Sequence, residues 1–443
     1  MTTSPVDVPA ALSNLVGDAE PASLLPAGRA VVAHVTPPYT LVAATSLGPG
    51  FLTVVADAVG QEFVVPLVIE AGRVRRAVAG DGLGEALVDR LADGDRLGHG
   101  FELDVLHTGA AGGERAIHVD QTHESVIIGD RAVVKWAVVA EPGEQPAPQR
   151  LRALDAAGFT AIPQPWAFVT YRGGRSGDVL VASVAQYLPG AQDGWTWCVA
   201  DVRALVDGTT TLPASVEPPA QIGTLTAQMH ASLAASTSLT SADVEQARRW
   251  ASEARAVLDE AVAIVDADEG LRLQARAPAI GADLDRLAEA APTPLIEVHG
   301  DFHVGQVLRY PGPHAQCYAF NDFDGNPVLS PAQRFERQPA ARDVAAMLAS
   351  LDHVGRVVIG RTDGADAIAV RSWIPAAQHA FLDAYRRGLH AAGRTDLFDE
   401  RLLRPMMAEQ ECREFVYAVR HLPHWRYVPD ATLAAMYPDP DEV

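Results

Sequence analysis

Hydrophobic and polar positions divide the chain into a sheet-rich first half and a helical second half. Short apolar runs rich in β-branched residues follow one another up to Pro189, and runs of this kind predict antiparallel strands. They begin at residues 30, 40, 51, 63, 101, 115, 124, 131 and 179, with a short predicted helix over 84–93 between them. Beyond Pro189, apolar residues recur at three- and four-residue steps, which predicts helices over 220–236, 244–265 and 281–290. A β-like block over 295–327 interrupts this helical half, and a further helix is predicted after residue 402.

Composition and charge describe a packed globular protein. Of the 443 residues, 48% are apolar and 21% are charged, which excludes a disordered chain and predicts two or three domains. The 35 basic and 56 acidic residues give a net charge of −21. Because such a surface repels phosphate backbones and anionic headgroups, we expect no nucleic acid and no membrane among the partners.

Cysteine usage and the first residues of the chain predict a cytoplasmic protein. Cys198, Cys317 and Cys412 lie more than 90 residues from one another, so neither a zinc cluster nor a disulfide framework is expected. The first basic residue is Arg29, which does not fit the charged start of a signal peptide, and the apolar runs are far shorter than a membrane span.

The β-like block carries the residue types of a phosphoryl-transfer site. His299, Asp301 and Gln306 follow the H-x-D-x-x-x-x-N spacing of kinase catalytic loops, with Gln in place of Asn. Asp322 then stands where the metal-binding Asp of a D-F-G element would stand, and Lys135 lies on an earlier predicted strand, as a phosphate-pairing lysine should. Such a site needs a carboxylate for the acceptor hydroxyl, oxygens for Mg²⁺ and a lysine for the nucleotide phosphates.

On these residues the chain resembles the maltokinase and aminoglycoside phosphotransferase branch of the protein-kinase-like superfamily, and most closely the actinobacterial glucosamine kinases. The matching segments are 121-QTHESVIIGDRAVVK, 141-EPGEQP, 186-QYLPGAQDGW, 299-HGDFHVGQVLR, 320-FNDFDGNP, 342-RDVAAML and 423-PHW. The resemblance implies an α+β, protein-kinase-like (aminoglycoside phosphotransferase-like) bilobal fold with a β-rich amino-terminal cap domain. It implies a cap over 1–90, an intermediate kinase-like lobe over 91–189 and a mainly helical carboxyl-terminal lobe over 190–443, with ATP between the last two.

The same resemblance implies a role for each site residue. Asp301 would be the catalytic base, and Gln306, Asp322 and Asp324 would hold Mg²⁺. The contacts to ATP would come from Lys135, Gln186, Tyr187 and Leu188.

Three departures from the pattern are visible. Gln149 stands near the position of the glutamate that usually pairs with the lysine. No G-x-G-x-x-G loop covers the phosphates, and 122-THES occupies that turn instead. Gln306 replaces an asparagine but keeps an amide oxygen, which a hard cation accepts.

Glu414 is the most informative residue of the predicted helix after residue 402. At 100° per residue it projects within about 20° of Met407 and Leu403, an apolar stripe where an unpaired carboxylate would be costly. One interpretation pairs it internally with Arg413 or Arg420. The other has it face the ammonium of an amino sugar.

The resemblance favours the second interpretation, because the family places substrate-binding residues in this segment. We therefore expect the sugar to contact Asp301 together with Glu409, Glu414, Arg420 and Trp425, with the tryptophan as an apolar platform. Ala418 replaces a second glutamate of the family pattern, which fits a changed sugar.

Several conspicuous residues are predicted to be structural. His299 is expected to hydrogen-bond within its loop, and His230, Arg342 and Asp343 are expected to support helices. The glycines of 80-GDGLG are predicted to form a turn rather than a phosphate loop.

The sequence thus predicts an ATP- and Mg²⁺-dependent glucosamine kinase acting on the 6-hydroxyl, with D-glucosamine and ATP as its partners and a monomer favoured. Maltose or an aminoglycoside remains open as the acceptor. A catalytically silent kinase-like binding protein and a metal hydrolase using His299, Asp301 and His303 are the alternatives of other classes.

Overall fold

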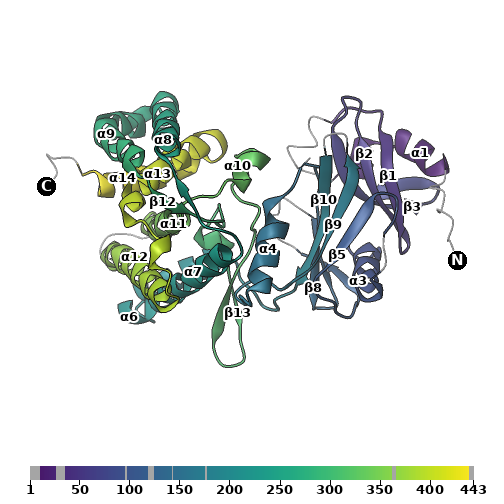
Figure 1. The fold of residues 1–443 in the computed structure, drawn as a ribbon, viewed down its shortest axis with the longest axis horizontal. Helices are drawn as coiled ribbons and strands as arrows, with labels where there is room; N and C mark the ends of the chain where they lie inside the picture. Colours follow the sequence, from purple (N-terminus) through teal and green to yellow (C-terminus); the bar gives the residue numbers. More distant parts are fainter. Residues whose placement is uncertain are drawn as a thin grey trace. The chain divides into compact units, whose positions relative to one another are not determined.

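The computed structural model describes residues 10–25, 35–94, 97–117, 124–141, 143–174, 177–361 and 366–438. The chain divides into two structural units (Figure 1). Unit 1 comprises 1–148 and 163–189, and unit 2 comprises 149–162 and 190–443. The strand predicted from residue 30 and the 122-THES turn fall largely outside the described residues.

The first sheet of unit 1 is antiparallel and follows chain order. It consists of β1 (Thr40–Leu47), β2 (Gly50–Ala56), β3 (Glu62–Glu70) and β4 (Arg73–Arg76). The middle strands β2 and β3 are buried on both faces, so their sequences read as continuous apolar runs rather than alternating ones. On one face Val55 and Val65 pack with Leu12 and Val16 of α1 (Ala10–Gly17), beside the short helix α2 (Pro21–Leu24).

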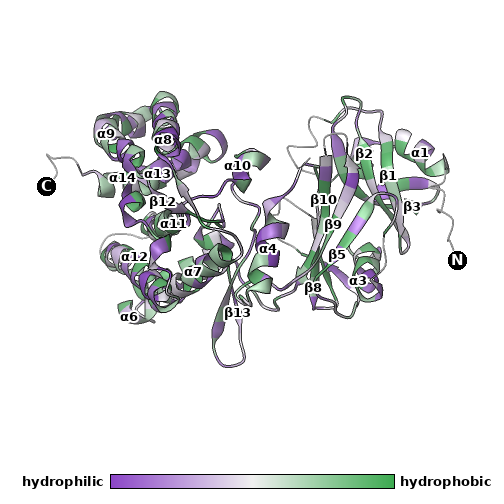
Figure 2. Cartoon of the chain, viewed as in Figure 1, coloured by the Kyte–Doolittle hydropathy of each residue, from purple (hydrophilic) through white to green (hydrophobic). Residues whose placement is uncertain are grey.

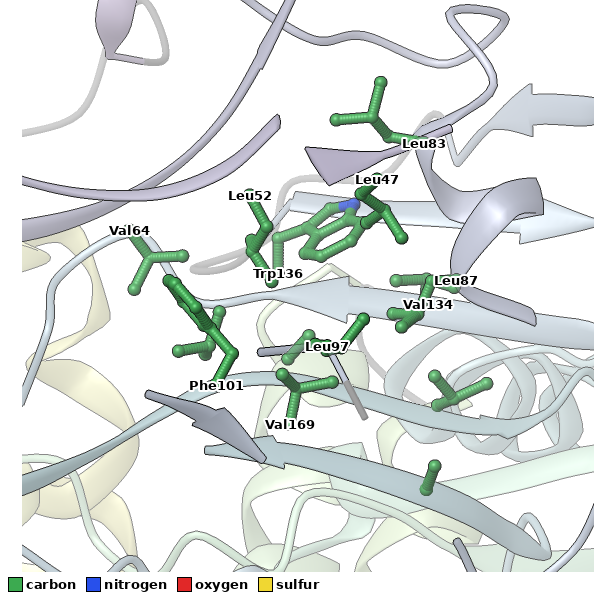
Figure 3. Packing of buried hydrophobic residues seen from close by; sticks show 14 of the residues in the cluster. Leu47, Leu52, Val64, Leu83, Leu87, Leu97, Phe101, Val134, Trp136 and Val169 are labelled. Atoms are coloured by element: carbon green, nitrogen blue, oxygen red, sulfur yellow. The ribbon is translucent and has the colours of Figure 1, made fainter. Parts of the chain in front are cut away.

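The second sheet of unit 1 has six strands in the order β5-β9-β10-β8-β7-β6, all pairs antiparallel. The strands are β5 (Phe101–Val105), β6 (Glu114–Ala116), β7 (Glu124–Ile128), β8 (Ala132–Trp136), β9 (Pro165–Gly174) and β10 (Gly177–Gln186). Its core joins the other face of the first sheet and the helix α3 (Leu83–Asp93). Figure 3 shows Trp136 of β8 in this core, among Leu47, Leu52 and Leu83.

The glycine-rich segment before α3 is a turn, as predicted. Gly80 and Gly82 have φ of +102° and +88°, which glycine adopts without strain. The backbone N–H groups of Gly80, Gly82 and Glu85 donate to the Glu114 carboxylate at 2.7, 2.9 and 3.0 Å. The Glu114 side chain of β6 therefore occupies the anion-binding site of a segment that resembles a phosphate loop.

Unit 2 is mainly helical. Its helices are α4 (Pro146–Ala156, from Gln149 on), α5 (Gly194–Val206), α6 (Leu212–Ser215), α7 (Glu217–Ala235), α8 (Val244–Ile264), α9 (Ala267–Asp285), α10 (Pro331–Phe335), α11 (Ala341–Ile359), α12 (Asp366–Ala391), α13 (Leu403–His421) and α14 (Tyr427–Met436). The predicted helix over 281–290 is the end of α9 followed by a 3₁₀ turn, η2 (Arg286–Glu289). The helices of this unit carry both hydrophilic and hydrophobic residues (Figure 2), as an amphipathic pattern requires.

Helix α11 is the centre of unit 2. It is buried along most of its length and packs against α5, α12, α13 and α14. The short strands β12 (Thr293–Leu295), β13 (Val307–Pro311) and β14 (Gln316–Phe320) flank the loops that reach the amino-terminal half of α11. None of the helices within the described ranges combines the length and the apolar character that crossing a membrane requires.

Candidate active site

Asp343, in the first turn of α11, anchors the loop that carries the predicted catalytic residues. Its carboxylate is fully buried and accepts the backbone N–H groups of His299 and Gly300 at 2.7 and 3.0 Å. The imidazole of His230 on α7 lies 3.1 Å away on the same carboxylate, and the Tyr385 hydroxyl holds its other nitrogen. Burial alone would raise the pKa of Asp343, but the hydrogen bond from His230 keeps that pKa below its ordinary value. Asp343 and His230 thus have the structural role that was predicted for them.

His299 is likewise structural. Its Nε2–H donates to the carbonyl of Asn321 at 2.9 Å, and its Nδ1 accepts the Asp301 N–H at 3.4 Å. Burial lowers the pKa of this imidazole, which keeps it neutral and suited to both contacts. The buried guanidinium of Arg150 donates to the carbonyls of His299 and Phe323 at 3.0 and 2.8 Å. The two loops of the site are therefore held to each other by buried hydrogen bonds.

The Asp-Gly-Trp run at the start of α5 supports the same loop. Asp193 caps the helix by accepting the Thr196 N–H at 3.0 Å. Gly194 then lets the helix approach the loop closely, since a Cβ there would lie 1.6 Å from the carbonyl oxygen of Val304. Trp195 follows at the wall of the cavity described below.

The hairpin of β13 and β14 brings the predicted metal ligands together. Gln306 directly precedes one strand, Asp322 follows the other, and the Asn321 N–H donates to the Gln306 carbonyl at 2.9 Å. Asp322 adopts φ +65°, an uncommon value for a residue other than glycine, and Asp324 lies two residues further on. Two carboxylates and an amide oxygen suit Mg²⁺, which keeps several waters and takes phosphate oxygens as further ligands. Within the described ranges no three His, Cys, Asp or Glu side chains are grouped as a metal site of their own.

Asp301 has the properties of a base that works near neutral pH. Its side chain is 28% exposed and lines the main cavity of unit 2. Burial raises its pKa to about 7, helped by the negative charges of Asp322 and Glu414. His303 lies beside it, with Nε2 3.9 Å from the Asp301 carboxylate, and burial lowers the pKa of this histidine to about 4. His303 is therefore neutral at physiological pH and does not offset the negative charge of Asp301.

The cavity has a volume of about 1010 Å³ and is bounded by α8, α11, α13 and the loop of Asp301. Glu414, Arg420 and Trp425 line it, and their contact with the acceptor stays a prediction. The Trp425 ring meets Trp195 edge to face, with centroids 5.7 Å apart at 87°. The half-buried Glu414 carboxylate accepts a hydrogen bond from the Gln410 amide at 3.0 Å.

The alternative pairing of Glu414 with Arg413 or Arg420 is wrong, because each arginine has another partner. Arg413 binds Glu409 at 2.6 Å, and Arg420 binds Glu260 of α8.

Glu409, which was expected to contact the sugar, is placed elsewhere. It is 2% exposed and does not line the cavity, and it also receives Arg342 at 3.3 Å. Burial would raise the pKa of Glu409, but the guanidinium groups of Arg342 and Arg413 keep it low. Its carboxylate is thus committed to an internal ion pair, and of the two candidate glutamates Glu414 remains.

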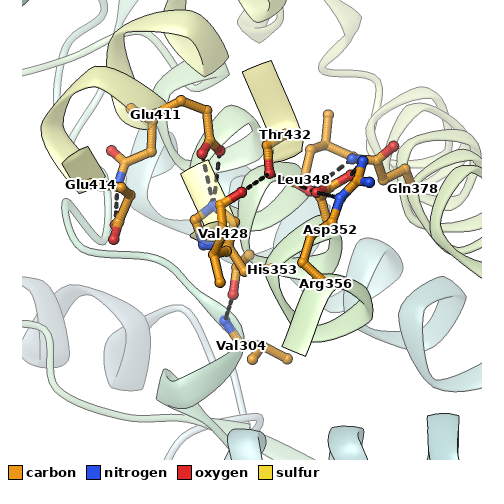
Figure 4. A network of polar contacts seen from close by, with 12 residues as sticks. Val304, Leu348, Asp352, His353, Arg356, Gln378, Glu411, Glu414, Val428 and Thr432 are labelled. Carbon is orange, nitrogen blue, oxygen red and sulfur yellow. Dashed lines mark hydrogen bonds and ion pairs between the residues drawn. The ribbon is translucent and has the colours of Figure 1, made fainter. Parts of the chain in front are cut away.

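A buried polar network behind the cavity was missed at the sequence level (Figure 4). His353 of α11 contacts both carboxylate oxygens of Glu411 at 2.9 Å, and both residues are buried. Burial alone would lower the pKa of His353, but the Glu411 carboxylate raises it, while burial raises the pKa of Glu411 itself, so the two groups share a buried charge-assisted hydrogen bond. Deeper in the protein, Asp352 accepts from Arg356 at 2.8 Å and from the Thr432 hydroxyl at 2.7 Å. A buried histidine and a carboxylate 58 residues apart give no local signal that they pair.

The predicted nucleotide residues lie in unit 1. Lys135 is the sole lysine of the chain and stands in β8 opposite Ser125 of β7 and Ser183 of β10. Gln186 ends β10, and the Tyr187 N–H donates to the Arg131 carbonyl at 2.7 Å.

The surroundings of Leu188, the last residue of the predicted nucleotide set, and of Gln149 are also defined. Leu188 is buried. Gln149, which replaces the usual partner of the lysine, opens unit 2, and its amide donates to the Glu297 carboxylate. The roles of Lys135 and of 186–188 toward ATP stay predictions.

Comparison with known proteins gives consistent relatives over most of the chain. A glucosamine kinase of Streptacidiphilus jiangxiensis is 53% identical over 440 residues, covering 96% of this chain and 98% of that protein. A glucosamine kinase of Mycolicibacterium smegmatis is 42% identical over 376 residues, covering 84% and 92%. No protein-family model matches the chain.

Among solved structures, a glucosamine kinase in complex with glucosamine, ADP and inorganic phosphate superimposes with a TM-score of 0.82. It is 50% identical, and the match covers 99% of this chain and all of the other. The predicted α+β fold class, with a β-rich first part and a helical second part, is confirmed.

Proposed function

The chain belongs to the glucosamine kinase family, and from this premise we propose that it transfers the γ-phosphoryl group of ATP to the 6-hydroxyl of D-glucosamine with Mg²⁺. The complex of a relative with glucosamine, ADP and phosphate supports both substrates. The choice of the 6-hydroxyl and the use of Mg²⁺ are our own extensions.

One observation carries the choice of acceptor: the base and the carboxylate proposed for the ammonium line the same cavity. Asp301 and Glu414 are close enough that the charge of Glu414 raises the pKa of Asp301. Two carboxylates at one cavity repel each other, and a cationic acceptor relieves that repulsion. A neutral sugar such as glucose or maltose does not, so the cavity favours an amino sugar.

The chemistry assigned to this chain's residues is limited and specific. Asp301 accepts or orients the proton of the attacking hydroxyl, and a pKa of about 7 matches that task at neutral pH. Glu414 binds the ammonium, and Trp425 covers an apolar face of the ring. Lys135 neutralises phosphate charge, and the Mg²⁺ held by Gln306, Asp322 and Asp324 would stabilise negative charge on the β- and γ-phosphates.

The test is ADP release from ATP·Mg²⁺ with a panel of glucosamine, glucose, N-acetylglucosamine, maltose and an aminoglycoside. We expect the highest kcat/KM with glucosamine and phosphate on its 6-hydroxyl by NMR. Asp301→Asn keeps the side-chain volume, so this variant should fold, bind ATP and show no transfer. Faster turnover of maltose or of the aminoglycoside would replace the proposal by that activity, and no turnover of any acceptor would favour a silent binding protein.

We place this activity in the cytoplasm and favour a monomer. Two of the three cysteines support the location: Cys198 and Cys412 are buried thiols, and burial raises the pKa of both, so they are unreactive and make no disulfide.

A further inference from the structure

The cavity around Asp301 is larger than one hexosamine and one phosphoryl group require. Its volume of about 1010 Å³ lies at the upper end of the roughly 300–1,000 Å³ range of pockets that enclose drug-sized ligands. On α11 the lining residues run from Arg342 to Val357, a stretch of roughly 22 Å at about 1.5 Å per residue. The acceptor ring and the transferred phosphoryl group fill only the part beside Asp301.

Helix α8 forms a polar wall along the remaining part. Arg249, Glu253 and Glu260 lie on one face of this helix, because spacings of 4 and 7 residues return to the same side. Arg249 pairs with Glu336 at 3.3 Å and with Glu253 at 3.9 Å, and Glu260 pairs with Arg420.

These ion pairs contribute little to the stability of the folded protein. The Arg249 and Glu253 side chains are 50% and 53% exposed, and exposed pairs typically contribute about 0–1 kcal/mol to stability. Guanidinium and carboxylate groups also offer planar sets of donors and acceptors, which suit pairs of neighbouring sugar hydroxyls. The wall and its two partners, Glu336 and Arg420, carry two positive and three negative charges, a net charge of −1, so the wall fits a cationic hydroxylated ligand such as a chain of amino sugars.

The aromatic pair gives a second, independent indication of a sugar chain. Trp195 comes from α5 and Trp425 from η6 (Pro423–Trp425), and both half-buried rings line the cavity. Their planes are nearly perpendicular, so the two rings offer apolar surfaces in two directions. One ring surface is enough for a single hexosamine, and the other is available to a ring attached to it.

We propose, on the basis of the function proposed above, that the natural acceptor is a glucosamine at the non-reducing end of an oligosaccharide. Its 6-oxygen attacks the γ-phosphorus, the bond from that phosphorus to the β,γ-bridging oxygen breaks, and ADP leaves with the electron pair. The proton of the hydroxyl passes to the Asp301 carboxylate. The following sugar units lie along the α8 wall, in contact with Arg249 and Glu253.

The test compares kcat/KM for glucosamine, its methyl β-glycoside and the β-1,4-linked dimer and trimer of glucosamine, with mass spectrometry locating the phosphate. We expect the trimer to exceed glucosamine by about tenfold through a lower KM, which corresponds to about 1.4 kcal/mol. Glu253→Gln should remove most of that advantage, because it removes a negative charge from the wall that faces the ammonium groups of the following sugar units. Glu245→Gln is the matched control, because Glu245 is an exposed carboxylate on α8 that does not line the cavity.

The outcomes separate this inference from the proposed function. If glucosamine is phosphorylated and the dimer and trimer are no better, the oligosaccharide site is refuted while the kinase activity stands. Equal effects of Glu253→Gln and Glu245→Gln on the trimer also refute the site, because a general loss of negative charge would then explain both. If neither glucosamine nor the trimer is phosphorylated, the proposed function itself is wrong.

Discussion

Glu414→Gln isolates the charge that is proposed to select the amino sugar. The glutamine has the same shape, and its amide oxygen can still accept the hydrogen bond from Gln410 that now measures 3.0 Å. The change therefore removes one negative charge and leaves the helix packing in place. A hydrogen bond to a charged group contributes about 1.5–3 kcal/mol, and the partial exposure of Glu414 favours the lower half of that range. We expect the KM for glucosamine to rise by about 10- to 150-fold, with the lower values favoured.

The assay is steady-state kinetics with glucosamine, glucose and N-acetylglucosamine at saturating ATP·Mg²⁺. The KM for glucose should change little, since glucose has no ammonium to lose, and the KM for ATP should stay constant. Glu245→Gln is the control, because Glu245 is an exposed carboxylate in the first turn of α8 outside the cavity. A second readout is the acidic limb of the pH profile, which should move to lower pH because the Glu414 charge raises the pKa of Asp301.

Two results would refute this reasoning. The first is a rise in the glucosamine KM of less than about twofold, since a direct charge contact cannot be worth so little at this site. The second is an equal rise in the KM for glucose and for glucosamine, which would mean that Glu414 shapes the cavity rather than binding the ammonium.

Three further predictions concern the base, the metal and the buried ion pair. Because the pKa of Asp301 is raised to about 7, this carboxyl is protonated below that pH, so kcat/KM should rise through pH 7. With glucosamine as the acceptor, and with no neutral sugar, kcat/KM should fall again above the pKa of the sugar ammonium, which is taken near that of an α-amino group at about 7.7–8.0. A flat pH profile of kcat/KM between pH 5 and 7 would contradict the role of Asp301. Asp322→Ala should abolish turnover at every Mg²⁺ concentration without unfolding the protein, and an unchanged Mg²⁺ titration removes Asp322 from the metal site. Glu411→Gln should lower the free energy of unfolding in urea by about 3–5 kcal/mol, because it leaves the buried His353 without its counter-charge. Adding His353→Gln should restore part of that loss, and a single-variant effect below about 1 kcal/mol would show that the pair is not ionic.

The catalytic loop could be predicted because its chemistry fixes residue types at short spacings. Asp301 and Gln306 belong to one loop, and the hairpin that follows Gln306 must return the chain to Asp322 whatever the rest of the fold does. The strands of unit 1 were predictable for a similar local reason, since apolar β-branched runs persist where both faces are buried.

Two strands of unit 1 were missed because local composition hides them. β4 reads Arg-Val-Arg-Arg, with three charged side chains in four positions, and its place in the sheet comes from pairing with β3. β9 starts at Pro165 and ends in glycines, both of which mark turns, although it pairs on both sides in the six-stranded sheet.

The glutamates of α13 show what a helical projection leaves open. It placed Glu414 on an apolar stripe, and the structure agrees that this side chain faces the cavity. It could not tell that Arg342, 67 residues earlier, reaches Glu409, or that His353 reaches Glu411. These partners decide which carboxylate is available to a ligand, and they are fixed by the packing of α11 against α13.

Lys135 supplies the chain with its only ε-amine, since every other cationic side chain apart from the histidines is an arginine. Acetylation, carbamylation or glycation of lysine therefore has one possible target in this protein, on the strand proposed to meet the nucleotide. A single acyl group would cancel the proposed phosphate contact, and bound ATP would shield the amine from the reagent. Acylation measured on the peptide that contains Lys135, with and without nucleotide, thus reports on the occupancy of one atom, separately from the α-amino group of the chain.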